Sequence, residues 1–302
     1  MSGYLHGFGR YLPERVVGNA ELAERFGKTP EWIESASGIR ERRYAAESEG
    51  VVEMAVLAAQ DCLRRVGAST IGMLIVSSGS GSSGFPGPAA AVAHKLGLEN
   101  TPAIDVPVAS AGSVFALALA MRLTEAHGDI LVVASEKMSA LLGDDPNTAI
   151  LFGDGAGAAL ISSRPGPWRL VDSVLHSDGQ YRDDLAFDGA LRMNGLNVIL
   201  HASRKMPGVM QELLERNQMP AASVAHFLVH QANLNLLTRV AKTLEVDREK
   251  FFSNIAHYGN TSSASMLIAA SEWAETNPAP GPVIFCGFGA GFHWGAVLAV
   301  GA

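Results

Sequence analysis

The chain has 302 residues, of which 48% are hydrophobic and 18% charged, and its formal net charge is −7. This acidic balance, without any block of lysine or arginine, argues against a nucleic-acid partner. No apolar run is long enough to span a bilayer, and the first residues show no basic region followed by an apolar core. Cys62 and Cys286 show neither metal-ligand spacing nor the density of a disulfide scaffold. We therefore expect a soluble, cytoplasmic protein.

The first part of the chain alternates strand and helix patterns. Apolar runs predict strands over Leu5–Leu12, Ile71–Ser77 and Ile130–Ala134. Start signals predict one helix that Asn19 caps and a second that begins after Thr29, with Pro30 at its first position. Helical spacing predicts further helices over residues 51–66, from Pro88 to Leu96, and after Ser110 to about His127. A charged turn is expected at Gly38–Arg43, and a pair of small-residue strands over Thr148–Ile161.

A strand, a sharp turn and a helix follow one another in Ala103–Ala118, and the strand is expected to be buried. The first turn of this helix would carry Ser110. A hydroxyl there lies among unpaired backbone N–H groups at the positive end of the helix dipole, which favours negative charge. Ser110 is therefore a candidate nucleophile, although a lone serine at such a place more often only caps the helix.

The second part of the chain repeats this style. A strand over His226–His230 would present His230 at its end, and further elements are predicted as helices over Asn233–Leu244 and Met266–Trp273 and strands over Val283–Gly291 and Gly295–Val300. Gly153–Gly157 and Gly287–Gly291 share a glycine pattern, which is a faint internal repeat. These features predict a layered α/β protein of two similar βαβαβ-type halves, residues 1–165 and 166–302, that share one core.

Three other classes of protein fit these motifs less well. Gly287–Gly291 opens no long helix and lacks an acidic residue at the required distance, so no dinucleotide site is predicted. No pair of histidines at helical spacing accompanies a carboxylate, so no metal site is predicted. A serine hydrolase has the same strand, serine, helix order, but it places glycine two residues before the serine, where this chain has Val108. That class stays open as a weaker alternative.

Three polar residues remain, each at the end of a strand or at a junction between a strand and a helix: Ser110, His230 and Asn260. Each alone is more often structural, as a helix cap, a hydrogen-bonded core histidine or a turn asparagine. Together, and surrounded by small residues, they favour a catalytic group.

Longer segments make the chain resemble the β-ketoacyl-acyl-carrier-protein synthase III family of the thiolase superfamily over nearly its whole length. The matching segments are Gly9–Glu14, Glu31–Ile33, Gly38–Arg42, Phe152–Gly157, His230–Asn233, Tyr258–Ser262, Ala264–Ser265, Gly287–Gly291 and Trp294–Gly295. The resemblance implies a thiolase fold with layers in the order αβαβα and a homodimer. It also implies an acyltransferase that uses a thioester of coenzyme A or acyl carrier protein, without a separate cofactor, in fatty-acid or polyketide-type biosynthesis.

The same resemblance implies roles for single residues. Ser110 stands where the family has its nucleophilic cysteine. His230 and Asn260 stand at the positions of the histidine and the asparagine with which the family decarboxylates a malonyl thioester and stabilises the resulting enolate. The oxyanion hole would consist of the backbone N–H groups of Ser110 and Ala290.

Further residues are implied to contact the substrate or its carrier. Phe288 would shield the nucleophile, Phe85 would cross the dimer to line the partner's acyl pocket, and Trp32 would stack on the adenine of coenzyme A. An acidic carrier protein could dock on basic residues that could equally form a solvated face, namely Arg204, Lys205, Arg239 and Lys242.

The serine is the main departure from the family. Its hydroxyl needs a base, and its ester is a poorer acyl donor than a thioester. Three explanations stay open: a natural serine-using acyltransferase, an engineered Cys→Ser variant, or a partner subunit that is not acylated. Natural divergence with an altered carrier is favoured by the atypical Pro107 and Ser113, and by uncharged residues where the family has arginine or lysine, namely Ala36, Pro146, Leu200 and Asn235. The serine also opens a second reaction, acyl transfer to an alcohol or amine without decarboxylation, with His230 as the base.

Overall fold

A computed structural model describes residues 3–67, 70–81, 84–276, 278 and 281–302. A nine-stranded mixed sheet runs through the molecule in the order β11-β12-β13-β8-β1-β7-β6-β4-β5. The strands of its first part are β1 (Tyr4–Tyr11), β4 (Met73–Ser77), β5 (Ala103–Val106), β6 (Ile130–Lys137) and β7 (Asp154–Ser162). Those of its second part are β8 (Trp168–Ser177), β11 (His226–Val229), β12 (Val283–Gly289) and β13 (His293–Gly301).

The two parts of the sheet have the same pairing pattern. In each, a parallel pair, β4 with β6 or β11 with β12, is followed by antiparallel pairs. The parts join where β1 meets β8, with Tyr4 opposite Arg169 and Leu5 opposite Trp168. The chain passes from one part to the other between β7 and β8, near residue 165, and the division into residues 1–165 and 166–302 stays a prediction.

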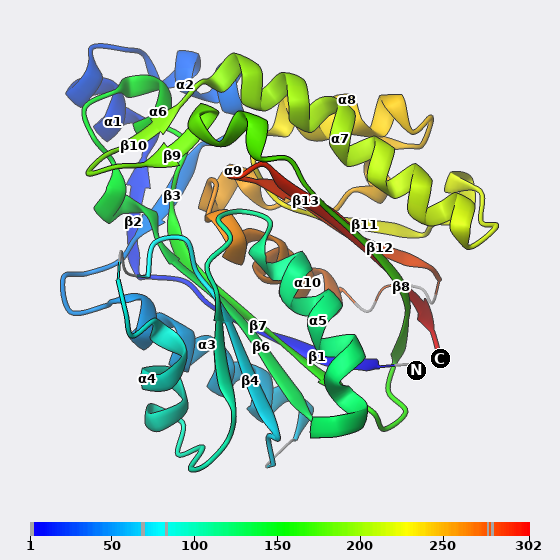
Figure 1. The fold of residues 1–302 in the computed structure, drawn as a ribbon. Helices are drawn as coiled ribbons and strands as arrows, with labels where there is room; N and C mark the ends of the chain where they lie inside the picture. The colour runs from blue at the N-terminus through cyan, green and yellow to red at the C-terminus, as the bar shows by residue number, and fades with distance from the viewer. Residues whose placement is uncertain (1–2, 68–69, 82–83, 277, 279–280) are drawn as a thin grey trace.

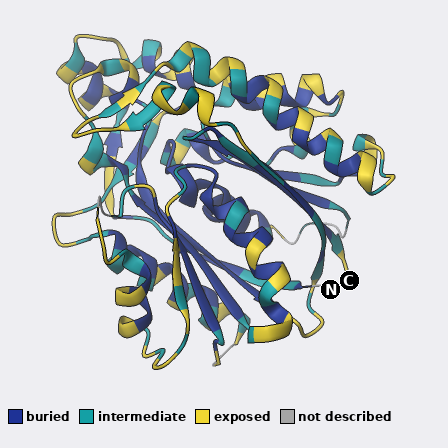
Figure 2. Cartoon of the chain, viewed as in Figure 1, coloured by how far each residue is buried: buried dark blue, intermediate teal, exposed yellow. Residues whose placement is uncertain are grey.

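Helices form three layers with the parts of the sheet between them (Figure 1). In the middle, α5 (Gly112–His127) and α10 (Ser265–Glu275) pack against strands of both parts. The outer layers are α3 (Val51–Val66) with α4 (Pro88–Lys95), and α7 (Gly195–Arg216) with α8 (Leu234–Thr243). Figure 2 shows α10 buried along most of its length, because a sheet covers it on two sides. The predicted αβαβα arrangement is confirmed.

Glycines allow the middle helices to lie close to the strands. A Cβ atom on Gly157 in β7 would lie 2.6 Å from Cβ of Leu267 in α10, and one on Gly287 in β12 would lie 3.2 Å from Cα of Ala111, next to α5. The repeated glycine pattern thus marks close packing between a strand and a middle helix or its cap in both parts, although β7 corresponds by its pairing to β13 rather than to β12. The pair of strands predicted over Thr148–Ile161 is wrong, because a short helix and one strand occupy this region.

Shorter elements surround one end of this framework (Figure 1). They are the paired strands β2 (Arg15–Gly18) and β3 (Glu41–Tyr44), the paired strands β9 (Leu185–Phe187) and β10 (Leu191–Met193), and the helices α1 (Asn19–Phe26), α2 (Pro30–Ser37), α6 (Pro146–Ala149) and α9 (Ile255–Tyr258). As predicted, Thr29 caps α2, where its side chain accepts a hydrogen bond from the Trp32 N–H.

Two predictions in this region are wrong for a shared reason. Asn19 does not cap α1, because Gly18 is the cap and the Asn19 amide turns inward to accept a hydrogen bond from Nη1 of Arg42 at 2.8 Å. Arg42 belongs to β3 rather than to a charged turn, and it is fully buried. Burial lowers the pKa of Arg42 to about 10. The run of charged residues in the sequence favours a surface turn, and it does not reveal the buried hydrogen bonds that hold Arg42 in place.

Other parts of the fold were missed or misplaced. No pattern predicted β8 or the 22-residue helix α7, which contains Pro207. β5 is a strand as predicted but not a buried one, because it pairs only with β4 and leaves Ile104 and Asp105 exposed. None of the helices built from the described residues has the length and apolar character that crossing a bilayer requires.

Candidate active site

Ser110 lies in the turn between β5 and α5. Its φ of 63° falls in the left-handed region, which serine rarely adopts. The helix begins at Gly112 with Ala111 as the cap residue and without a side-chain cap, so Ser110 precedes the predicted first turn and caps nothing. A buried serine held in an unusual conformation without a capping role is a candidate for chemistry.

The end of β12 presses against this turn from the second part of the chain. A Cβ atom on Gly289 would lie 1.9 Å from the Ala109 carbonyl oxygen and 2.9 Å from Cβ of Ser110. Only glycine fits at such a distance. This contact brings Phe288 and Ala290, both predicted site residues, next to the pockets that Ser110 lines.

His230 directly follows β11, as predicted. Its backbone N–H donates to the Cys286 carbonyl at 2.8 Å, and its ring Nδ1 lies 2.7 Å from the Ser265 hydroxyl at the start of α10. Burial lowers the pKa of His230 to about 4, although a hydrogen bond with the Ser262 backbone opposes this shift. The ring is therefore neutral at physiological pH, and the hydroxyl contact on Nδ1 leaves Nε2 for a substrate.

Asn260 follows α9 and is fixed through its backbone. Its N–H donates to the Leu151 carbonyl at 2.8 Å, and its carbonyl accepts from the Gly153 N–H at 3.1 Å. Oδ1 of its side chain accepts a hydrogen bond from the Ser262 N–H at 2.9 Å. Because that oxygen is occupied, the Asn260 amide has its Nδ2 hydrogens available for the pocket.

Ser262 connects the three candidates. Its hydroxyl lies 3.0 Å from the Ser110 backbone nitrogen, which donates to it, and 3.5 Å from the Ser110 hydroxyl. Ser262 is buried, and its φ of 48° is also left-handed. The hydroxyl thus occupies the backbone N–H of Ser110, one of the two predicted oxyanion donors.

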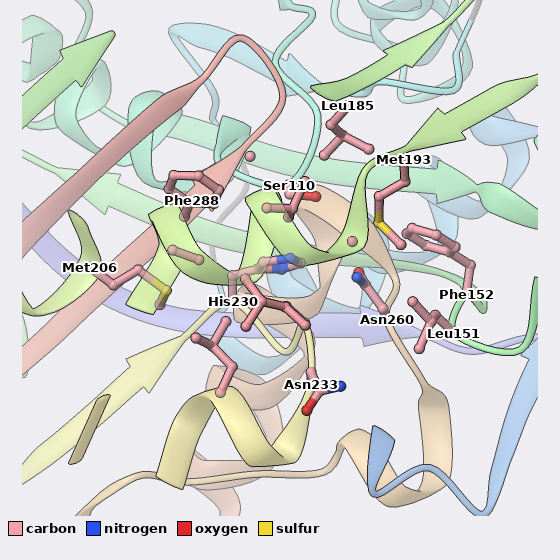
Figure 3. Close-up of a pocket in the computed structure, with 17 residues that line it drawn as sticks. Ser110, Leu151, Phe152, Leu185, Met193, Met206, His230, Asn233, Asn260 and Phe288 are labelled. Carbon is pink, nitrogen blue, oxygen red and sulfur yellow. The ribbon is translucent and has the colours of Figure 1, made fainter. Parts of the chain in front are cut away.

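Two pockets meet at Ser110. Figure 3 shows Ser110, His230 and Asn260 around one of them, whose apolar walls come from Leu151, Phe152, Leu185, Met193, Val198, Met206, Leu236 and Phe288. The other pocket is lined by Ser110, Ser262 and Ala290 together with Met138, Leu141, Phe187 and Leu191. A substrate with two apolar arms could place its reactive carbon at the Ser110 hydroxyl and one arm in each pocket.

Two predicted substrate contacts lie elsewhere in this single chain. Trp32 is half-buried against the cluster formed by α1 and α2, and the Lys28 Nζ lies 5.0 Å from the centre of its ring. Phe85 is 98% exposed. Neither lines the pockets at Ser110, and their predicted roles toward adenine and toward a partner's pocket stay predictions.

The predicted docking residues differ in how free they are. Arg204 on α7 and Arg239 and Lys242 on α8 are exposed. Lys205 is engaged within the chain, because its Nζ lies 3.4 Å from an Asp178 carboxylate oxygen and 3.8 Å from the centre of the Trp294 ring. Lys205 is therefore the least available of the four for a carrier.

The rim of the first pocket, next in sequence to residues that line it, carries apolar and amide side chains. On α7, Leu196 is 85% exposed and Leu200 is 41% exposed. Asn235 on α8 donates through its amide to the carbonyl of Ser35 at 3.2 Å and more weakly to that of Ala36. This position ties α8 to the end of α2 and presents no cation to a phosphate.

Neither cysteine can supply a nucleophile to these pockets. Cys62 in α3 and Cys286 in β12 are buried in separate apolar clusters. Burial raises the pKa of the Cys62 thiol to about 12, and it also raises the pKa of Cys286. Within the described part of the chain, no three His, Cys, Asp or Glu side chains gather as metal ligands.

Sequence reasoning missed the supporting contacts of the site. Ser262 and Ser265 belong to segments that match the family, but Ser110 and Ser262 are 152 positions apart and the sequence gives no signal that the two meet. Gly289 was part of a glycine pattern whose close contact with Ser110 only the fold reveals.

Comparison with known proteins agrees with the fold. The family of 3-oxoacyl-(acyl-carrier-protein) synthase III matches residues 104–179, and its C-terminal family matches residues 214–300. The β-ketoacyl-(acyl-carrier-protein) synthase III of Oleidesulfovibrio alaskensis is 36% identical and covers 98% of both chains. The chain belongs to this family. The predicted class of enzyme, an acyltransferase of the ketoacyl synthase III type, is thereby confirmed.

Solved structures of the family superpose on the whole chain. The 3-oxoacyl-(acyl-carrier-protein) synthase III of Aquifex aeolicus has a TM-score of 0.95 at 32% identity and covers 99% of both chains. A priming β-ketosynthase from a polyketide biosynthetic pathway has a TM-score of 0.92 at 31% identity, over 99% of this chain and 96% of that one. Fatty-acid and polyketide biosynthesis are thus both represented among the relatives.

Proposed function

We propose that this protein transfers an acyl group from a thioester to Ser110, which takes the place of the family's nucleophilic cysteine, and then condenses it with a malonyl thioester. The observation that carries the proposal is the position of Ser110. It is a buried serine in a left-handed conformation, at the meeting point of two pockets, beside His230 and Asn260. The two thiols are buried, line neither pocket and have pKa values raised by burial, so they offer no alternative nucleophile.

In the first step, the Ser110 hydroxyl attacks the thioester carbonyl and loses its proton to Nε2 of the neutral His230. The carbon–sulfur bond breaks, and the leaving thiolate takes the proton from the imidazolium. The backbone N–H groups of Ser110 and Ala290 stabilise the negative oxygen of the tetrahedral intermediate. For this, the Ser262 hydroxyl gives up the Ser110 N–H, to which it lies 3.0 Å away in the free protein.

In the second step, the neutral His230 ring carries its proton on Nε2 and accepts a hydrogen bond from the Ser265 hydroxyl on Nδ1, the opposite tautomer from the one that acts as a base. A malonyl thioester then binds with its carbonyl oxygen toward Nδ2 of Asn260 and Nε2 of His230. The bond to the carboxylate breaks, carbon dioxide leaves, and the electron pair forms an enolate that these donors stabilise. The enolate carbon attacks the Ser110 ester, a carbon–carbon bond forms, and the bond to the Ser110 oxygen breaks. The serine oxygen then takes a proton from water.

We also propose that the enzyme works as a cytoplasmic homodimer whose carrier differs from that of its relatives. Two features on neighbouring surfaces support a dimer: the unpaired edge of β5 with its exposed Ile104, and the exposed ring of Phe85. An exposed strand edge and a fully exposed aromatic ring both favour association. The uncharged rim with Leu200 and Asn235 supports a carrier held by apolar contacts rather than by its phosphates.

The serine supports a second candidate reaction, in which the acyl group passes to an alcohol or amine. The ester on Ser110 is a weaker acyl donor to carbon than a thioester, and the neutral His230 can deprotonate an oxygen or nitrogen nucleophile. The two reactions differ in one product, since only condensation releases carbon dioxide.

The test follows the mass of the intact protein after exposure to acetyl-coenzyme A and to longer acyl thioesters. Wild-type protein is expected to gain one acyl group. Ser110→Ala should lose the adduct and reduce turnover by roughly 10⁴-fold or more. Ser162→Ala, which changes a buried serine in β7 that contacts Asp129, serves as the matched control and should keep the adduct.

Carbon dioxide release with a malonyl carrier then separates the two reactions. Release together with a lengthened acyl product supports condensation, and acylation of an added alcohol or amine without release supports the second candidate. An adduct that persists in Ser110→Ala would contradict Ser110 as the acceptor. A rise in condensation by orders of magnitude in Ser110→Cys would point to a cysteine ancestor or parent.

A further inference from the structure

Glu136 has a buried carboxylate beside the candidate site, and the proposed reaction does not use this carboxylate. It lies near the end of β6 and is fully buried. It accepts hydrogen bonds from backbone N–H groups and hydroxyls of two separate loops, which are those of Ser78, Gly79, Ser80 and Ser263. A carboxylate in the interior is costly unless donors surround it, so this arrangement binds the loops to Glu136.

The two carboxylate oxygens hold different parts of the molecule. Oε2 accepts from the Ser80 N–H at 2.9 Å and from the Ser80 hydroxyl at 2.5 Å, in the first part of the chain. Oε1 accepts from the Ser263 N–H at 3.2 Å and from the Ser263 hydroxyl at 2.6 Å, in the second part. Glu136 therefore links residues that are 127 positions apart in the sequence.

The loop of the first part rests against the segment that carries Ser110. A Cβ atom on Gly79 would lie only 2.7 Å from Cβ of Ala109, the residue before Ser110. The Gly79 N–H lies 3.0 Å and 3.1 Å from the two Glu136 oxygens. A shift of the carboxylate would therefore move a direct neighbour of the Ser110 turn.

The loop of the second part contacts the other candidates. Ser262, next to Ser263, accepts a hydrogen bond from the Ser110 N–H and donates one to Oδ1 of Asn260. Its backbone also forms a hydrogen bond with His230. Through Ser263, Glu136 is one residue away from contacts with Ser110, His230 and Asn260.

We propose that Glu136 is a positioning residue, which holds the Ser110 turn of the first part in register with the His230 and Asn260 segments of the second. The inference rests on the proposed function, in which Ser110 is the acyl acceptor. The enolate carbon must approach the ester on Ser110 within a narrow range of distances and angles, and an error near 1 Å can cost roughly 100-fold in rate. A carboxylate anchored on both sides limits such errors.

The test replaces Glu136 by glutamine, which has nearly the same size but exchanges one acceptor oxygen for an NH2 group. That group would face the N–H and hydroxyl donors of one loop. We expect kcat for condensation to fall roughly 10- to 100-fold, while KM for the acyl thioester changes by less than about twofold, because Glu136 itself lines neither pocket. A variant that only lost folded protein would lower the amount of active enzyme in proportion to the loss seen by circular dichroism.

Asp129→Asn is the matched control at the opposite end of β6. Asp129 accepts a hydrogen bond from the Ser162 hydroxyl and pairs with Arg164, away from both pockets. Its kcat should stay within about twofold of wild type, since removing a contact far from the reacting groups leaves their geometry unchanged. Ser263→Ala removes one of the hydroxyls on Glu136 and should lower kcat severalfold, by less than Glu136→Gln does.

The outcomes separate the two proposals. Wild-type protein that forms no adduct on Ser110 overturns the proposed function and this inference with it. Wild-type protein that forms the adduct, with Glu136→Gln condensing at the wild-type rate, overturns the role of Glu136 alone. Should Glu136→Gln fail to fold, Ser263→Ala decides the matter, and an unchanged kcat in that variant overturns the inference.

Discussion

The two parts of the sheet share their strand pairing and a middle helix, but they lead into the candidate site by different routes. In the first part, β5 runs directly into the Ser110 turn and α5. In the second part, the place of β5 is reduced to a single bridge between Phe227 and Phe251, and the chain reaches α10 through α9 and residues 259–264. This longer route brings Ser262 next to Ser110 and places Asn260 in the same pocket, whereas Ser110 is the only one of the three catalytic candidates that the first part contributes.

The starts of the two middle helices divide the site in the same manner. Ser110 stands before α5, and Ser265, the first residue of α10, contacts the His230 ring at 2.7 Å. A duplicated framework thus presents the proposed nucleophile just before one middle helix and holds His230, proposed to act on the second substrate, against the start of the other. This comparison predicts that condensation can be damaged without acylation at Asn260, a residue of the second part that the proposed acylation step does not use.

Among the variants that test this comparison, the largest effect is expected for Asn260→Ala. Loss of the amide removes a donor to the enolate oxygen, which should lower decarboxylation and condensation by roughly 10²- to 10³-fold. Acylation of Ser110 should stay close to the wild-type rate, because its proposed oxyanion donors are backbone groups. Rapid-quench measurement of the acyl adduct and a carbon dioxide assay give the two rates.

The control for this prediction is Asn254→Ala, which changes another buried asparagine just before α9. Its amide donates to Glu272, away from both pockets, and both rates should be retained. If Asn260→Ala slowed acylation as much as condensation, the assignment of Asn260 to the second step alone would be wrong.

An intermediate effect is expected in the pH dependence of stability. Burial lowers the pKa of His230 to about 4, whereas an unfolded histidine titrates near 6.5. Between these values the unfolded chain binds a proton here that the folded chain does not. The free energy of unfolding should therefore decrease as the pH falls through this window, by about 3 kcal/mol in total for this group.

His230→Gln removes this titration, so its free energy of unfolding should vary less between about pH 6.5 and pH 4 than that of the wild type. Urea denaturation at each pH measures the difference. The exposed His94→Gln variant should keep the wild-type slope. A slope that is identical in wild type and His230→Gln would show that the ring is already solvated in the folded state.

The same comparison explains what could be predicted from the sequence. Residues at strand ends can be predicted, because an apolar run followed by small residues and a helix pattern indicates where the strand stops. This pattern located Ser110 and His230. The fold brings Asn260 beside them, while the roles of the three stay proposals. Buried polar contacts cannot be predicted from the sequence in the same way. A charged residue such as Glu136 or Arg42 is expected at the surface unless its hydrogen-bond partners, which lie far away in the sequence, are known.

Two elements of the fold differ from what their sequence patterns predict, each for its own reason. α7 was missed although it supplies Val198 and Met206 to the first pocket, since Pro207 interrupts its pattern without ending the helix. The burial of β5 was predicted from its apolar letters, but its exposed edge is the kind of surface that another chain covers. Apolar composition alone does not distinguish a core strand from an interface strand.

The smallest effect is expected at an outer link between the two parts. Glu275, at the end of α10, accepts hydrogen bonds from Arg10 of β1 and Arg65 of α3, and the bond from Arg10 is the main reason that its pKa is lowered to about 2. Because the Glu275 side chain is 43% exposed, solvent screens these pairs. Glu275→Gln should reduce the free energy of unfolding by less than about 1 kcal/mol at low salt, and by less at high salt, as measured by urea denaturation.

The contacts of Glu275 with Arg10 and Arg65 join the same two parts as Glu136 does, but Glu275 contacts neither Ser110 nor Ser262. The condensation rate of Glu275→Gln should therefore stay within about twofold of wild type, since the geometry around the reacting carbon is unchanged. A loss of rate as large as that expected for Glu136→Gln would mean that any weakening between the two parts disturbs the site. The buried carboxylate would then have no special part in aligning the Ser110 turn with the His230 and Asn260 segments.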